Sequence, residues 1–151
     1  MSEHSRLIWN DVAPEGAKAL FGIHHYLMTG TNLPQELIHL VFLRVSQING
    51  CAHCIDLHSR DLLKTMSVEK LVLVPVWEEV PHLFSDQYRA ALAWAESVTR
   101  VSETHAPDAD YAAAAAAFAP KDLVDLTIAI ATMNAFNRLG VPFRLPVKAQ
   151  A

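Results

Sequence analysis

Charged residues are scarce in this 151-residue chain, and basic residues are not in excess. Only 19% of the sequence is charged, with 12 Lys and Arg against 16 Asp and Glu, which gives a formal net charge of -4. Binding to nucleic-acid phosphates requires a basic footprint. We therefore expect no nucleic-acid partner.

Long apolar runs are also missing. No stretch approaches the ~20 apolar residues that a membrane-spanning helix needs. Residues 1–6 carry an acid and a basic side chain and have no apolar core of the signal-peptide kind. We therefore expect no membrane association and a cytoplasmic location, where a cysteine pair more often performs redox chemistry or binds a metal than forms a structural disulfide.

Glycine is scarce, with five residues, and the alternation typical of strands is almost absent. Segments with helical periodicity are instead delimited by proline and glycine. Helices are expected to begin near Pro14, Pro34, Pro107 and Pro120, and to end near Gly30, Gly50 and Gly140. Ser67 and Ser85 are candidate N-caps. The sequence predicts one all-α domain over residues 1–151, a helical bundle of about six or seven helices.

The two cysteines are the most informative of the scarce residues. A chain of this length buries enough surface to fold without disulfides, so Cys51 and Cys54 are available for chemistry. Their Cys-x-x-Cys spacing follows Gly50, at the expected start of a helix. Oriented N–H groups and the helix dipole favour a thiolate there. The spacing also lets the two sulfurs approach each other.

Three of the eight histidines, His39, His53 and His58, fall near these cysteines. His58 follows Cys54 by four residues, which places it one helical turn further on the same face. There it can accept the thiol proton as a general base. His53 lies inside the motif and either adds positive charge or lines the entrance to the site.

The segment 43–58, LRVSQINGCAHCIDLH, resembles the signature of the alkylhydroperoxidase D-like core in the carboxymuconolactone decarboxylase superfamily. Further matching segments are 77–79, 88–96 and 134–139, so the resemblance covers residues from about 36 to 144. It implies an all-helical antioxidant fold that assembles into homo-oligomers, commonly trimers or hexamers.

The resemblance also implies residue roles. Cys54 would attack a hydroperoxide, Cys51 would resolve the resulting sulfenic acid into a disulfide, and an external dithiol reductant or reductase would restore both thiols. The roles of admitting the substrate and of relaying protons would fall on His53 and His58. The implied activity is a thiol-dependent peroxidase that needs no cofactor and no metal.

His39 departs from the family pattern, which usually has a glutamate twelve residues before the first motif cysteine. A histidine accepts a hydrogen bond but supplies no fixed negative charge. Glu36, one turn earlier on the same helix, is the candidate to compensate. His39 is thus either a relay residue or a hydrogen-bonded core histidine.

Several alternatives stay open at this point. Cys51, Cys54, His58 and one more histidine would make a tetrahedral zinc site. A second alternative is a non-enzymatic, redox-responsive oligomer. A third is a lyase that performs the ring-opening or decarboxylation chemistry of the superfamily's namesake. The 52% hydrophobic content independently favours an oligomer.

Other residues have structural expectations. Arg44 is a charge within an apolar helix and should pair with Asp56 or Glu96. Asn134 and Asn137 should make buried hydrogen bonds or an oligomer contact. The tryptophans Trp77 and Trp94 should pack in the core or at a subunit interface, and the pair His24 and His25 should be surface or interface residues.

Overall fold

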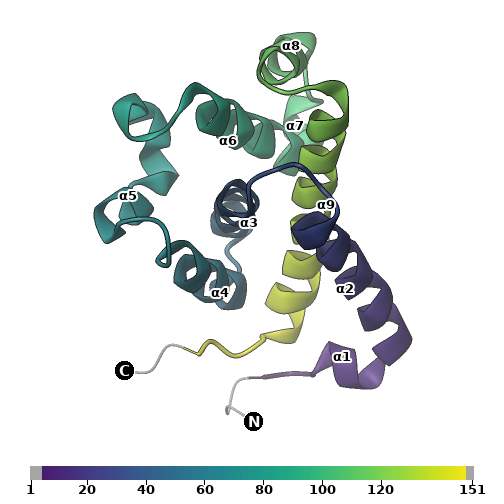
Figure 1. Ribbon diagram of the computed structural model, residues 1–151. Coiled ribbons are helices and arrows are strands. Elements are labelled where there is room, and N and C mark those ends of the chain that lie inside the picture. The colour runs from purple at the N-terminus through teal and green to yellow at the C-terminus, as the bar shows by residue number, and fades with distance from the viewer. Residues whose placement is uncertain (1–4, 149–151) are drawn as a thin grey trace.

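A computed structural model describes residues 5–148, which form helices and connecting segments without any strand (Figure 1). The longer helices are α2 (Pro14–Thr29), α3 (Gln35–Asn49), α4 (Ala52–Leu62), α6 (Asp86–Thr99), α8 (Asp108–Ala117) and α9 (Pro120–Phe143). Shorter elements are α1 (Trp9–Val12), α5 (Val68–Val72), α7 (Val101–Thr104) and the 3-10 turns η1 (Val74–Glu79) and η2 (Pro81–Leu83). The predicted all-α class is confirmed, with six helices of ten residues or more in the described part. Residues 1–4, which belong to the segment without a signal-peptide pattern, lie outside the described residues.

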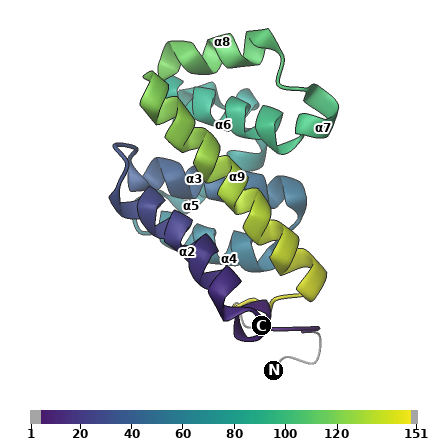
Figure 2. The same ribbon diagram turned by 90° about the vertical axis from the view of Figure 1, so that its right-hand side faces the viewer.

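Helix α3 lies at the centre of the bundle, with α2, α4, α6 and α9 around it (Figures 1 and 2). Eight of its 15 residues are buried, and Phe42 is completely buried. Burying one such aromatic side chain contributes about 1.5–3 kcal/mol. Because α3 packs on more than one side, as its sequence predicted, side chains from different neighbouring helices meet along it.

The turn from α3 into α4 positions the cysteines. Gly50 ends α3 in the left-handed conformation with φ +69°, and its N–H donates to the carbonyls of Gln47 and Ser46. A residue with a side chain would be strained there. The chain therefore reverses within one residue, and Cys51 becomes the N-cap of α4.

Helix α9 does not end at Gly140, as the sequence predicted. It continues through Gly140 and Pro142 to Phe143, and Arg144 ends it in the left-handed region with φ 51°. The glycine has a packing role, because α9 passes close to the cysteine sulfur atoms at this point. At 24 residues it is the longest helix, yet no described helix is long and apolar enough to cross a bilayer.

The first and last described segments lie at the same end of the bundle, below α2 and α4 in Figure 2. The Arg6 N–H donates to the Phe143 carbonyl at 3.0 Å, and its guanidinium donates to the Pro142 carbonyl at 3.2 Å. These bonds hold residues 5–8 beside the segment that leaves α9. Both segments contribute to the cavity described below.

Candidate functional site

The two cysteines lie together at the start of α4. Cys51 is the N-cap and Cys54 lies in the first turn, as predicted. Both thiols are free and buried, with exposed fractions of 1% and 5%, and their sulfur atoms are 2.7 Å apart. Such proximity makes the pair a dithiol that shares a hydrogen bond.

This hydrogen bond separates the acidities of the two thiols. It lowers the pKa of Cys51 from an ordinary 9.0 to about 6, because the Cys54 thiol donates to the Cys51 sulfur. The same bond raises the pKa of Cys54, and burial raises it further. Since the proton is held between two adjacent sulfurs, the titration belongs to the pair. Near neutral pH the pair therefore carries one thiolate and one thiol.

A polar cluster from α3 and α9 supports the dithiol. The Asn137 amide donates to the Ser46 hydroxyl at 3.1 Å and accepts from Asn49 at 3.0 Å. Hydrogen bonds from Asn137 lower the pKa of both cysteines, and a bond from Ser46 lowers that of Cys54. The buried hydrogen bonding expected of Asn137 is confirmed. Sequence reasoning missed Ser46, which lies among other polar residues near the end of α3 and so gave no distinct signal.

Gly140 lets α9 approach the dithiol. A Cβ atom at this position would lie 2.8 Å from the Cys51 sulfur and 3.8 Å from the Cys54 sulfur. The backbone of α9 therefore covers the side of the pair away from solvent.

Two of the predicted histidines meet between α3 and α4. The Nδ1 atoms of His39 and His58 are 3.4 Å apart, and His39 Nδ1 is 3.7 Å from Asp61 Oδ2. His58 is only 3% exposed, and burial is the main cause that lowers its pKa to about 3. Burial also lowers the pKa of His39, against the attraction of Asp61, which raises it.

The acid beside His39 is Asp61 and not Glu36. Glu36 instead forms a hydrogen bond with the Tyr88 hydroxyl. Burial is the main cause that raises the pKa of Tyr88, and Glu36 raises it further. Sequence reasoning missed Asp61. Its signal was the three-residue spacing from His58, which places both on one face of α4.

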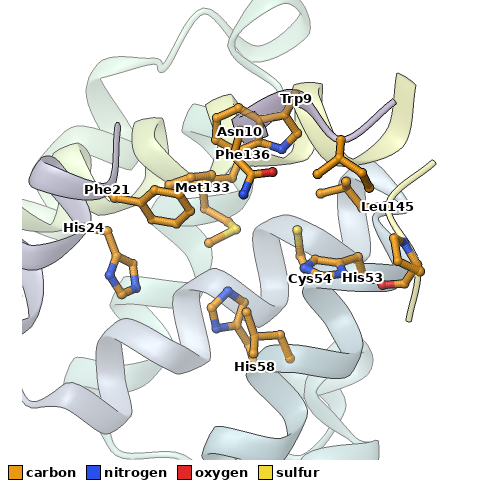
Figure 3. A pocket seen from close by; sticks show the side chains of 13 residues that line it. Trp9, Asn10, Phe21, His24, His53, Cys54, His58, Met133, Phe136 and Leu145 are labelled. Atoms are coloured by element: carbon orange, nitrogen blue, oxygen red, sulfur yellow. Dashed lines mark hydrogen bonds between the residues drawn. The ribbon is translucent and has the colours of Figure 1, made fainter. Parts of the chain in front are cut away.

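A cavity of about 390 Å³ opens in front of Cys54 (Figure 3). Apolar side chains dominate its lining: Ile8, Trp9, Phe21, Leu57, Met133, Phe136, Leu145 and Pro146. His24, His53 and His58 also line it, whereas Cys51 does not. Of the two thiols, Cys54 is therefore the one that a bound molecule meets.

The wall of this cavity includes residues that the sequence did not assign to it. His24, expected at the surface or an interface, lines the cavity and stacks on Phe42 with ring centroids 5.8 Å apart. His53 also lines the cavity, and its Nδ1 is 2.6 Å from the Pro146 carbonyl. The Lys148 N–H donates to Asp56 Oδ2 at 2.9 Å. These two contacts hold the segment after α9 against α4.

Arg44 pairs with Glu96, which decides between its two expected partners. Arg44 Nε donates to Glu96 Oε1 at 2.7 Å, and Trp77 Nε1 donates to the same oxygen at 2.8 Å. Trp77 and Trp94 are both buried, as expected. These two hydrogen bonds connect η1 and α3 to Glu96 on α6.

A dithiol at a helix start, facing an apolar cavity in an all-helical bundle, defines an alkylhydroperoxidase D-like domain. Comparison with known proteins agrees. The model of the carboxymuconolactone decarboxylase family matches residues 14–97, more than half of the chain. The protein belongs to this family.

Individual relatives extend the match beyond that segment. YdfG from Bacillus subtilis (strain 168), an uncharacterized protein, is 30% identical over 137 residues, which cover 90% of this chain and 92% of YdfG. The crystal structure of ATU0492 from Agrobacterium tumefaciens, of unknown function but suggested to be the antioxidant defence protein AhpD, superposes with a TM-score of 0.91 at 35% identity. That match covers 97% of this chain and 99% of ATU0492. The debrominase Bmp8 shares the fold, with a TM-score of 0.78 at 19% identity over 92% of this chain and 74% of its own.

Proposed function

We propose that this protein is a thiol-dependent peroxidase that reduces organic hydroperoxides through a Cys51–Cys54 dithiol–disulfide cycle. The observation that carries the proposal is the 2.7 Å pair of free sulfurs, of which only Cys54 reaches the apolar cavity. Family membership and the close similarity to ATU0492 support it.

In the first step the Cys54 thiolate attacks the terminal oxygen of the hydroperoxide. The S–O bond forms, the O–O bond breaks, and the alkoxide takes a proton and leaves as an alcohol. Cys51 then attacks the Cys54 sulfenic acid, so that the disulfide forms and hydroxide leaves, to be protonated to water. An external dithiol reduces the disulfide and is itself oxidised to a disulfide. The thiolate of the resting pair is on Cys51, whose pKa is lowered, so the attacking Cys54 thiolate forms when the shared proton crosses the 2.7 Å between the sulfurs to Cys51.

His58 is the proposed proton carrier for this cycle, with His39 and Asp61 behind it. The His58 ring lines the cavity while its Nδ1 faces His39. A proton taken up by His58 can pass to His39, where the Asp61 carboxylate lies 3.7 Å away. Asp61 thus supplies the negative charge that the family obtains from a glutamate at the position of His39.

The cavity favours a hydroperoxide with a sizeable apolar group. Apolar and aromatic side chains form most of its wall, so binding such a group removes apolar surface from water on both sides. We expect kcat/KM for an aromatic hydroperoxide such as cumene hydroperoxide to exceed that for hydrogen peroxide by at least about tenfold. The proposal also includes assembly into a trimer or hexamer, which a light-scattering mass would test.

The deciding experiment is peroxide consumption with a dithiol donor, combined with titration of free thiols. Wild-type protein should lose both thiols on treatment with cumene hydroperoxide and turn over repeatedly when dithiothreitol is present. Cys54→Ser should abolish consumption. Cys51→Ser should stop after one equivalent and retain a sulfenic acid at Cys54, detectable by mass spectrometry after dimedone labelling. His82→Gln, at an exposed histidine that does not line the cavity, is the matched control.

Other outcomes would favour the alternatives. One oxidation without turnover, followed by a change of oligomer mass, would indicate a redox-responsive oligomer. Lyase activity on a lactone substrate that survives loss of both cysteines would indicate the reaction of the family's namesake. Retention of both thiols after peroxide treatment would eliminate the peroxidase.

A further inference from the structure

We propose that His39, His58 and Asp61 form a zinc-binding site between α3 and α4, separate from the two thiols. One ligand atom of each residue, an imidazole nitrogen from the histidines and a carboxylate oxygen from the aspartate, lies within 4.8 Å of the other two. Two histidines and a carboxylate are a ligand set that Zn²⁺ accepts, with water in the fourth position.

The spacing of the two imidazoles fits a bridging ion as well as it fits a long hydrogen bond. Their Nδ1 atoms are 3.4 Å apart, at the long end of the distances at which N–H groups donate. Two nitrogens 3.4 Å apart, each about 2.05 Å from one zinc ion, would subtend about 112° at the metal, close to the tetrahedral angle. The two side chains already place these nitrogens at the required separation.

Asp61 completes the site with a small movement. Its Oδ2 lies 3.7 Å from His39 Nδ1, while Oδ1 accepts from Lys64 at 2.7 Å. The Asp61 carboxylate can therefore keep the lysine on one oxygen and turn the other towards an ion. The Lys64 ammonium opposes a cation, but its side chain is 71% exposed and free to turn into solvent.

The site is reachable from solvent without passing the dithiol. The His39 and Asp61 side chains are 17% and 25% exposed, whereas His58 is 3% exposed. An ion would therefore enter past Asp61 and meet the buried imidazole last. Bound zinc would occupy the His58 nitrogen that faces His39, and on the proposed peroxidase it would slow turnover by blocking proton transfer. That consequence depends on the proposed function, but the binding itself does not.

The test measures Zn²⁺ binding in a variant without thiols, because Cys51 and Cys54 would otherwise bind zinc themselves. The chain has two cysteines, so Cys51→Ser with Cys54→Ser removes every thiol. Isothermal titration should show one Zn²⁺ per chain, and Zn²⁺ should raise the melting temperature. Co²⁺ should give the visible absorption of a four-coordinate nitrogen and oxygen site, without a thiolate band.

Adding His39→Gln or Asp61→Asn to this background should weaken Zn²⁺ binding at least about tenfold and remove the zinc-dependent rise in melting temperature. Adding His82→Gln should change neither, because that exposed histidine lies on η2. Equal binding in the His39→Gln and His82→Gln proteins would overturn the proposal, as would no binding in the thiol-free protein. If His39→Gln fails to fold, Asp61→Asn decides, since it removes a partly exposed carboxylate. A protein that binds zinc but reduces no peroxide would refute the peroxidase and leave the metal site standing.

Discussion

Gly140 and the sulfur of Cys51 are so close that a methyl group on Gly140 would lie 2.8 Å from the sulfur. This is nearer than real Cβ contacts, so either the Cys51 side chain or the backbone of α9 must shift. The dithiol is thus held by a surface that tolerates no side chain at this position.

Gly140→Ala should destabilise the protein by about 1–3 kcal/mol, the usual range for overpacking a core. Gly22→Ala is the matched control, since it is also a glycine within a helix but has nothing within 4 Å of its Cβ position. It should stabilise by up to about 1 kcal/mol, because alanine has the better helix propensity. Urea unfolding measures the change in the free energy of unfolding for both variants. Equal changes would contradict the packing role of Gly140.

The pH dependence of thiolate absorbance should report the shared proton. Because the pKa of Cys51 is lowered to about 6, the thiolate is lost as pH falls through 6, and nearly all of the protein carries it at pH 7.5. The ultraviolet absorbance of the thiolate in the reduced protein should follow that curve, since it needs no reagent to reach the buried Cys51. In Cys54→Ala the donor is missing, so the midpoint for Cys51 should move upwards towards 9.0. An unchanged midpoint would mean that the neighbouring sulfur is not what acidifies Cys51.

Glu96→Gln should cost about 1–3 kcal/mol of stability. The Glu96 carboxylate accepts from both Arg44 and Trp77, and the Arg44 side chain is only 11% exposed, so a neutral partner leaves a poorly solvated guanidinium. The surface pair Arg89–Asp86 provides the comparison, because Asp86 is 94% exposed. Asp86→Asn should cost less than about 1 kcal/mol. Thermal unfolding would show whether the order is as stated.

His53→Ala should loosen the segment after α9. The 2.6 Å contact with the Pro146 carbonyl would be lost, while the hydrogen bond from Lys148 to Asp56 on α4 would stay. Amide exchange at residues 145–148 should accelerate several-fold, while exchange in α3 stays slow. Faster exchange throughout the chain would instead indicate general destabilisation.

Local signals in the sequence predicted the helices well. Pro34, Gly50, Ser67 and Ser85 act through hydrogen bonds and φ angles within a few residues, so their effects can be inferred without the fold. The placement of the cysteines at a helix start followed from Gly50 alone. The prediction at Gly140 was wrong for the same reason. A glycine there locally indicates a helix end, whereas its role is the close approach to Cys51, nearly ninety positions earlier in the chain.

The site was predictable only where its parts lie on one helix. Cys54 and His58 are one turn apart on α4, and their spacing indicated a shared face. Asn137 and Ser46 are 91 residues apart and meet only because α9 packs across α3. His24 and Trp9 line the cavity through the packing of α1 and α2, for which no spacing in the sequence gives a signal.

The distance along the chain between the dithiol and its α9 cover also has a consequence during synthesis. Asn137 follows Cys54 by 83 residues, which at about 5–20 residues per second takes the ribosome roughly 4–17 seconds. During that interval the nascent chain already contains both thiols but lacks the helix that buries them. Each new molecule therefore passes through a brief stage in which its cysteines are open to cellular oxidants and to other thiols, before α9 packs over them.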